Sequence, residues 1–293
     1  MTRALSSALD AELTRAGLDP RAVAAQVERA VAEDLPGEDV TSAATLDPSA
    51  TGWADLVARG DGVVAGLAVA ELVFRQVVVG VEVVRAASDG DRVTRGDVLL
   101  SVHGAVAALL TAERTALNFL CHLSGVATAT ARWVDALEGT TARVRDTRKT
   151  TPGLRALEKY AVRCGGGLNH RATLSDQALV KDNHVLAAGG VVPAYEAVRA
   201  RYPDLPLQIE VTTLDQLREL LDVGAPEILL DNMSTALLAE AVRIADGRAR
   251  LEASGGLTLQ RAREVAETGV DLIAVGGLTH SAPVLDIAMD LRA

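Results

Sequence analysis

Cysteine and lysine are scarce in this 293-residue sequence. Its two cysteines, Cys121 and Cys164, form no C-x-x-C pair, which excludes a disulfide framework and a cysteine-rich zinc site. Such low cysteine usage fits a reducing cytoplasm, and we expect the protein to be cytoplasmic. The three lysines, Lys149, Lys159 and Lys181, all lie in one part of the chain, because arginine replaces lysine elsewhere.

Long uninterrupted apolar runs are also absent. Asp10 and Glu12 stand where a signal peptide needs an apolar core, so we expect no export. The most apolar stretch, 63–84, is interrupted by charged and amide side chains, and its many valines suit strands better than a lipid-facing helix. We therefore expect no membrane span.

Charge is unevenly distributed along the chain. The formal net charge is −10, and an acidic protein repels phosphate backbones, so we expect no nucleic-acid partner. Residues 143–171 nevertheless carry eight arginines and lysines against two acids. A cationic block of this kind suits a site for a small polyanion, although a solvated basic helix face gives the same pattern.

The first half of the chain predicts a mixed unit. With 49% apolar and 23% charged residues, the sequence has the balance of a folded protein with a sizeable core. A helix is predicted to start at Asp19-Pro20, an N-cap followed by a proline, and to end near Glu33. Glycine-punctuated valine runs over 52–102 predict a small, mostly β unit. Residues 105–137 have a helical pattern, which we expect to break or kink at Ser124-Gly125.

The second half predicts a parallel α/β sheet or barrel, because short apolar strands alternate with helical stretches after Gly139. The predicted strands are 142–145, 178–180, 207–209, 227–230, 250–253 and 272–275.

Polar or glycine residues follow each of these six strands. Because the carboxyl ends of parallel barrel strands open on one face, these groups should converge into one polar mouth. Taken singly, each polar residue has an alternative role as the cap of the next helix. The segments are Asp146-Thr147-Arg148-Lys149, Lys181-Asp182-Asn183-His184, Glu210-Val211-Thr212, Asp231-Asn232, Ser254-Gly255-Gly256 and Gly276-Gly277.

The composition of this mouth predicts an anion site. Glycine pairs after the last two strands favour a phosphate site, although a simple turn is the alternative. Arg148 and Lys149 precede Thr151-Pro152, a predicted helix start, and a glycine run at 165–167 leads to His170 and Arg171. Because arginine grips carboxylates with two parallel hydrogen bonds and lysine acts as a point charge, a ligand with carboxylate and phosphate groups is indicated. Ordinary surface ion pairs remain the alternative for each of these cations.

Two carboxylates, Glu210 and Asp231, end adjacent predicted strands in this cationic mouth. They are suited to hold ribose hydroxyls, a divalent metal or a carbon with developing positive charge. An alternative is that they are structural partners of Lys181 and Arg171.

Long ordered motifs carry a resemblance that runs from about Ala30 to near the C-terminus. They are ERTALNFLCHLSGVAT (113–128), DTRKTTPGLR (146–155), EKYAVRCGGGLNHR (158–171), VKDNH (180–184), IEV (209–211), LLDNM (229–233), EASGG (252–256) and VGGLTH (275–280). Together they resemble the quinolinate phosphoribosyltransferases, the carboxylating nicotinate-nucleotide pyrophosphorylases.

The resemblance implies an α/β fold with an N-terminal α/β sandwich domain, 1–116, and an incomplete parallel α/β barrel of six or seven strands, 117–293. It implies a homodimer and an enzyme, a pentosyltransferase of NAD biosynthesis. The reaction would join quinolinate to phosphoribosyl pyrophosphate, releasing pyrophosphate and carbon dioxide and forming nicotinate mononucleotide. The alternative is a related phosphoribosyltransferase acting on a different acid, such as the molybdenum-transport-associated homologues.

The resemblance also implies roles for individual residues. The catalytic set would be Lys149, Lys181, Glu210 and Asp231. The quinolinate carboxylates would be held by Arg148, His170, Arg171 and Lys181, with Arg114 contributed by the partner subunit. Lys149 would lie near the pyrophosphate, and Glu210 and Asp231 would position the ribose and Mg²⁺. The remaining substrate-binding residues would be Thr147, Ser254, Gly255, Gly256, Val275, Gly276, Gly277 and His280.

Overall fold

The computed structural model describes residues 7–292, which divide into two compact units. One, which we call the sheet unit, contains residues 7–129, 156–166 and 281–292. The other, the barrel unit, contains residues 130–155 and 167–280. Within 7–292 no helix has the length and apolar character that crossing a bilayer requires.

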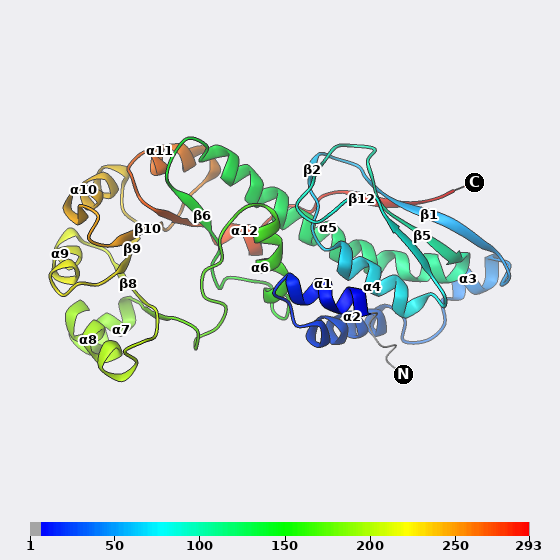
Figure 1. The fold of residues 1–293 in the computed structure, drawn as a ribbon, viewed down its shortest axis with the longest axis horizontal. Helices are drawn as coiled ribbons and strands as arrows, with labels where there is room; N and C mark the ends of the chain where they lie inside the picture. Colours follow the sequence, from blue (N-terminus) through cyan, green and yellow to red (C-terminus); the bar gives the residue numbers. More distant parts are fainter. Residues whose placement is uncertain (1–6, 293) are drawn as a thin grey trace. The chain divides into compact units, whose positions relative to one another are not determined.

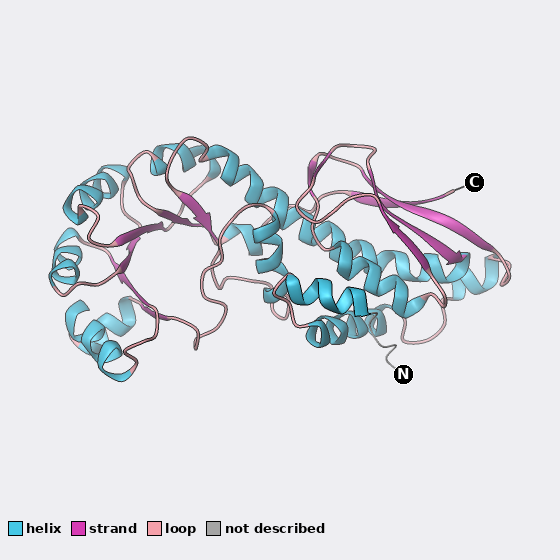
Figure 2. Ribbon diagram, in the orientation of Figure 1, coloured by secondary structure: helices cyan, strands magenta, loops and turns pink. Residues whose placement is uncertain are grey.

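The sheet unit is built on a four-stranded antiparallel sheet in the order β12-β1-β5-β3 (Figure 1). Its strands are β1 (Thr51–Ala58), β3 (Glu82–Arg85), β5 (Val98–Ala105) and β12 (Ile287–Leu291), and β2 (Gly62–Val63) pairs with β4 (Arg92–Val93). Its helices are α1 (Ser7–Arg15), α2 (Pro20–Asp34), α3 (Val40–Thr45), α4 (Leu67–Val77), most of α5 (Val106–Ala136) and most of α6 (Arg155–Cys164). Sheet and helices together make the mixed α/β unit that the resemblance implied (Figure 2).

The helix predicted from Asp19-Pro20 is confirmed as α2. Asp19 is its N-cap, since the carboxylate accepts hydrogen bonds from Arg21 N at 2.9 Å and Ala22 N at 3.4 Å. These bonds satisfy backbone N–H groups that have no partner within the helix.

The predicted break at Ser124-Gly125 is wrong, because α5 runs through both residues. Ser124 Oγ instead bonds across to another segment, accepting from Ala65 N at 3.0 Å. At Gly125 a side chain would meet the backbone of Pro283, with a Cβ only 2.3 Å from its carbonyl oxygen. The small residues therefore allow close approach of neighbouring chain segments, and they do not end the helix.

The prediction of a mostly β unit over 52–102 missed one helix, α4. Its residues from Leu67 to Phe74 are all buried, so the apolar run reflects burial on every side. Asp89 stabilises the start of α4, because its two carboxylate oxygens accept from Gly66 N and Leu67 N, each at 3.0 Å. The capping side chain lies 22 residues further along the chain, so no local pattern announced it.

The barrel unit contains six parallel strands in the order β6-β11-β10-β9-β8-β7. They are β6 (Arg143–Arg145), β7 (Ala178–Val180), β8 (Leu207–Val211), β9 (Glu227–Asp231), β10 (Arg250–Ser254) and β11 (Leu272–Ala274). They curve into an open arc with helices on the outer side, which confirms the incomplete barrel with six strands (Figures 1 and 2). The helices are α7 (Asp182–Ala188), α8 (Val191–Arg201), α9 (Leu214–Asp222), α10 (Thr235–Ala245), α11 (Ala262–Ala266) and α12 (Gly277–His280), with a 3-10 turn at Leu259–Arg261.

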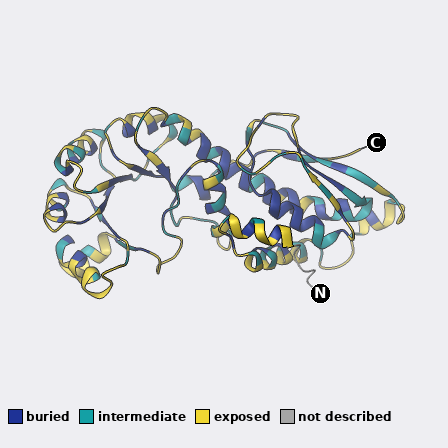
Figure 3. Ribbon diagram, viewed as in Figure 1, coloured by how far each residue is buried: buried dark blue, intermediate teal, exposed yellow. Residues whose placement is uncertain are grey.

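Alternation along the strands decides which side chains face the inside of the arc. In β8, Leu207, Ile209 and Val211 are buried on the helix side, while Gln208 and Glu210 take the other face. The same period of two in β9 and β10 brings polar residues to the inner face. The strands are accordingly buried, and the outward surfaces of the covering helices are exposed (Figure 3).

The helix start predicted at Thr151-Pro152 is displaced, because α6 begins at Arg155. Residues 151–154 form a turn in which Leu154 N donates to Thr151 O at 3.0 Å, and Gly153 has a φ of +83°. The positive φ at Gly153 is incompatible with a helix running through the turn.

Candidate active site

A pocket of about 740 Å³ opens at the carboxyl ends of the barrel strands. All sequence-predicted site residues except Arg114 line it. The pocket therefore gathers groups from every one of the six strand ends, as parallel topology requires. Asp182 and Asn232, from the strand-end segments expected to converge here, also line the pocket. The sequence gave no role to the other lining residues, which are Leu179, Leu229, Glu252, Leu257 and Ala274.

The cationic wall of the pocket contains two guanidinium groups that influence each other. Burial, together with the positive charge of Arg148, lowers the pKa of Arg171 from its ordinary value. Nε of Arg148 is buried and has no hydrogen-bond partner within the described part of the chain. An unpaired buried donor is costly, so this wall is arranged for an anion that supplies the missing acceptors.

The acidic side of the pocket contains Glu210 and Asp231, which end the neighbouring strands β8 and β9. Glu210 Oε2 lies 3.7 Å from Lys181 Nζ, so the ion pair considered from the sequence is present. Burial raises the pKa of Glu210 above its ordinary value; the Lys181 charge opposes this shift and the Asp231 carboxylate adds to it. The lysine side chain is half exposed, which leaves it available to a ligand.

The glycine-rich end of the pocket is fixed by close contacts between strand ends. Gly255 has a φ of +97°, and a Cβ placed there would lie 2.3 Å from Asn232 Oδ1. Asn232 itself has a φ of +54°, unusual for a non-glycine residue, and its Nδ2 donates to Asp231 Oδ2 at 2.8 Å. At Gly276, a Cβ would lie 3.1 Å from Lys149 Cδ. Glycine at 255 and 276 is what lets these polar side chains approach the backbone.

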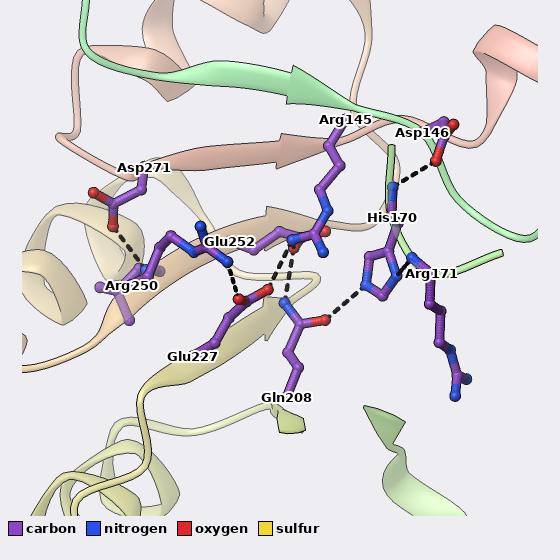
Figure 4. Close-up of polar contacts among 10 residues, drawn as sticks. Arg145, Asp146, His170, Arg171, Gln208, Glu227, Arg250, Glu252 and Asp271 are labelled. Carbon is purple, nitrogen blue, oxygen red and sulfur yellow. Dashed lines mark hydrogen bonds and ion pairs between the residues drawn. The ribbon is translucent and has the colours of Figure 1, made fainter. Parts of the chain in front are cut away.

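Beneath the pocket lies a buried network of charged and amide side chains (Figure 4). Arg145 NH1 donates to Glu227 Oε1 and to Glu252 Oε2, each at 2.7 Å. Gln208 Nε2 also donates to Glu252 Oε2 at 2.7 Å, and Gln208 Oε1 lies 2.8 Å from His170 Nε2. Polar residues at alternate positions of apolar strands are the sequence signal that could have identified this network.

Arg114 is the one predicted site residue that lies outside the lining of the pocket. It lies on α5, and its side chain is 67% exposed. Its NH2 is 4.0 Å from Glu113 Oε1, at the limit of an ion pair. An exposed pair of this kind contributes little to stability, so the arginine is available for other contacts.

Family models and known proteins match the chain over nearly its whole length. Residues 39–124 match the N-terminal domain of quinolinate phosphoribosyl transferase, and residues 126–290 match its C-terminal domain. The nicotinate-nucleotide pyrophosphorylase [carboxylating] of Mycobacterium leprae is 52% identical over 271 residues, covering 90% of this chain and 95% of that protein. A probable enzyme of the same name from Bacillus subtilis is 40% identical over 260 residues, covering 88% of this chain and 90% of that protein.

Solved structures agree with the sequence comparisons. The NadC structure from Streptococcus pyogenes has a TM-score of 0.90 and 40% identity, covering 94% of this chain and 99% of that chain. The nicotinate-nucleotide pyrophosphorylase from Francisella tularensis has a TM-score of 0.90 and 35% identity, covering 93% of this chain and 96% of that chain. These matches confirm the resemblance found in the motifs, and the chain belongs to the quinolinate phosphoribosyltransferase family, whose members are enzymes of NAD biosynthesis.

Proposed function

We propose that the pocket of the barrel unit transfers the phosphoribosyl group of phosphoribosyl pyrophosphate to quinolinate. The products are nicotinate mononucleotide, pyrophosphate and carbon dioxide. The observation that carries this proposal is the Arg148 guanidinium, whose buried Nε has no hydrogen-bond partner among the described residues and whose charge lowers the pKa of Arg171. Two guanidinium groups this close suit a ligand with two adjacent carboxylates.

Quinolinate fits the cationic wall through its two carboxylates. Arg148 and Arg171 each offer a planar fork of donors, and Lys181 adds a half-exposed ammonium group. Arg148 follows β6, Arg171 lies between α6 and β7, and Lys181 follows β7, so the pocket gathers cations enough for two carboxylates. Nicotinate and nicotinamide lack one or both carboxylates, so the same wall discriminates against them.

The phosphate groups of the sugar substrate fit the glycine-rich end of the pocket. Gly255 and Gly256 have positive φ values of 97° and 58°, and they expose backbone near Ser254. Lys149 and His280 approach Gly276, with Lys149 Cδ 3.1 Å and His280 Nε2 3.3 Å from the place of a Cβ there. Backbone N–H groups with a lysine are a common way to hold a phosphate.

Mg²⁺ fits the acidic side only together with the substrate. Among residues 7–292 no group of three His, Cys, Asp or Glu side chains is arranged to hold a metal, and Glu210 and Asp231 are a pair. Mg²⁺ commonly takes one or two carboxylates and completes its coordination with water and substrate phosphates. When bound, the ion would neutralise charge on the leaving pyrophosphate.

The chemistry proposed for this site needs orientation and charge rather than a covalent enzyme intermediate. The bond between the anomeric carbon and the pyrophosphate oxygen breaks, and the ring nitrogen lone pair forms the new bond to that carbon. Glu210 and Asp231 stabilise the positive charge that develops on the sugar. The ring nitrogen is then cationic, and its charge stabilises the electron pair left on the adjacent ring carbon when carbon dioxide departs, after which a proton binds that carbon in place of the lost carboxylate.

Arg114 is proposed to act in the pocket of a partner subunit, which makes the functional unit a homodimer. Its exposure and its weak pairing with Glu113 support this role. Mixing inactive Arg114→Ala protein with inactive Glu210→Gln protein should restore activity, because mixed dimers contain one pocket free of both substitutions. If mixed dimers form and activity does not return, the shared-site proposal is wrong.

A cytoplasmic location is also proposed, and the two free cysteines fit it.

The proposed reaction is tested by measuring pyrophosphate release with quinolinate, nicotinate and nicotinamide in turn. Quinolinate should be turned over with one carbon dioxide released for each pyrophosphate, and the other two should give little turnover. Use of nicotinate in preference to quinolinate would refute the assignment. Release of pyrophosphate only with another acid would instead favour the related phosphoribosyltransferases with a different substrate.

A further inference from the structure

A chain of hydrogen bonds leads from the cationic wall of the pocket into the buried network (Figure 4). Arg171 N lies 2.7 Å from His170 Nδ1, and His170 Nε2 lies 2.8 Å from Gln208 Oε1. Gln208 Nε2 then reaches Glu252 Oε2 at 2.7 Å. Apart from Arg171, these side chains are buried, with His170 at 7% exposure and Gln208 and Glu252 at 0%.

The two ends of this chain fix its direction independently. At the outer end, a backbone N–H of Arg171 can only donate, so His170 Nδ1 must accept and the ring proton must be on Nε2. At the inner end, Glu252 Oε2 receives donors from Arg145 and Gln208, so the Gln208 oxygen faces the imidazole. That oxygen accepts from the Nε2 proton, and both ends therefore assign the same neutral tautomer.

We propose that Gln208 and Glu252 are positioning residues for quinolinate binding. They hold His170 as its neutral Nε2–H tautomer, and His170 in turn fixes the backbone that directs the Arg171 guanidinium into the pocket. His170 then acts through Arg171, because each of its ring nitrogens already has a partner in the protein. This differs from the carboxylate contact that the family resemblance implies for His170, and it rests on the proposed use of quinolinate.

Two observations favour a functional purpose for this network over a purely structural one. Glu252 Oε1 is buried with no hydrogen-bond partner in the described residues, a costly feature in an arrangement selected for stability alone. Glu252 also lines the pocket, so the network is continuous with the site. Within residues 7–292, the guanidinium of Arg171 makes one hydrogen bond, from Nη1 to Gln177 O at 3.0 Å. Its direction therefore depends on the backbone that His170 holds.

The tautomer is tested directly on the wild-type protein by nitrogen NMR of ¹⁵N-labelled histidine. His170 should show an unprotonated Nδ1 and a protonated Nε2, assigned by comparison with the His170→Asn variant. A protonated Nδ1 would overturn the proposal. This measurement does not depend on quinolinate turnover, so it separates failure of the inference from failure of the proposed function.

The positioning role is tested with Gln208→Leu, which keeps the side-chain size and removes both hydrogen bonds. The KM for quinolinate should rise about tenfold, because buried His170 and Glu252 each lose their hydrogen bond to Gln208. The KM for phosphoribosyl pyrophosphate should stay within about twofold, since the two Gln208 hydrogen bonds, to His170 and Glu252, involve none of its proposed contacts. The His170 Nε2 signal should also shift, because its proton loses the Gln208 oxygen as acceptor.

Glu227→Gln is the matched control, because Glu227 contacts Arg145 and Arg250 in the same network and does not line the pocket. Both variants should lower the melting temperature, and only Gln208→Leu should shift the His170 Nε2 signal and raise the quinolinate KM. An equal rise in quinolinate KM in the control would show that general loosening of the core is responsible. An unchanged His170 Nε2 signal or an unchanged quinolinate KM in Gln208→Leu would also overturn the positioning role.

Discussion

The side-chain amide of Asn232 occupies the space that a side chain at position 255 would need. A Cβ at Gly255 would lie 2.3 Å from Asn232 Oδ1 and 2.9 Å from Asn232 N. The same amide donates to Asp231, and Asn232 N donates to Ser254 O at 2.9 Å. The ends of β9 and β10 are therefore interlocked at the point where the proposed ribose and phosphate contacts meet.

Gly255→Ala should reduce activity with phosphoribosyl pyrophosphate, because the new methyl group displaces Asn232 and with it the Asp231 carboxylate. The forced positive φ adds a cost of about 1–3 kcal/mol. The KM for phosphoribosyl pyrophosphate should rise more than that for quinolinate. Gly256→Ala is the comparison variant, since it has a φ of +58° and open space around a Cβ. It should have the smaller effect, and equal effects would mean that backbone strain alone is responsible.

Arg148→Ala should raise the KM for quinolinate far more than the KM for phosphoribosyl pyrophosphate. Loss of charge-assisted hydrogen bonds of about 1.5–3 kcal/mol predicts a change of one to two orders of magnitude. Steady-state kinetics with each substrate varied in turn measures the split. Arg218→Ala, an exposed arginine paired with Asp215 outside the pocket, is the control and should leave both constants unchanged. Equal effects of Arg148→Ala on both substrates would contradict its assignment to quinolinate.

Arg171→Lys should be harmful even though the positive charge is kept. A lysine cannot reproduce two parallel hydrogen bonds to a carboxylate. The hydrogen bond from the Arg171 guanidinium to Gln177 O is also lost. We expect a rise of about tenfold or more in quinolinate KM, on the scale of a lost charge-assisted hydrogen bond. Near-normal kinetics would show that Arg171 does not bind a carboxylate with both nitrogens.

Glu210→Gln should abolish most activity and leave the protein equally or more stable at neutral pH. Burial raises the pKa of Glu210, so its contribution to stability is present below its unfolded pKa and is lost as the pH rises through its folded pKa. At neutral pH the ionised carboxylate is thus kept at a cost to folding, which the amide avoids. Removing its charge stabilisation of the transition state should reduce kcat by about two orders of magnitude or more.

The pH dependence of wild-type activity should also follow from Glu210. Activity should fall on the acid side as Glu210 is protonated, with a midpoint above the ordinary glutamate pKa because burial raises it. The residual activity of Glu210→Gln should lack this acid limb. Thermal unfolding and kcat measured over the same pH range check both statements, and an unchanged acid limb in the variant would assign the limb to another group.

Arg145→Leu should destabilise the barrel unit strongly. Its removal leaves Glu227 and Glu252 buried without their shared cation, and breaking a buried ion pair costs about 3–5 kcal/mol. Arg250→Leu is the comparison, because Arg250 is half exposed and pairs with Glu227 only at the edge of the network. It should cost about 1 kcal/mol. Denaturant unfolding at neutral pH measures both, and similar values for the two variants would contradict the central place of Arg145.

Local features of the fold follow from the order of the amino acids alone. Strand positions in the barrel unit, the helix at Pro20–Asp34 and the polar residues after each strand follow from alternation, capping and turn chemistry, which act between near neighbours. Parallel topology then brought those strand ends into one pocket. The family motifs contain these strand-end residues.

Contacts between side chains far apart in the chain could be identified only from the folded structure. Ser124 and Gly125 looked like a helix break, and their small size instead serves contacts with Ala65 and Pro283. Arg145 meets Glu252, 107 positions away, and that contact carries the network beneath the pocket. Such pairings depend on the register between strands and on which face each side chain takes. Local patterns restrict these choices, and the packing of the whole sheet selects among them.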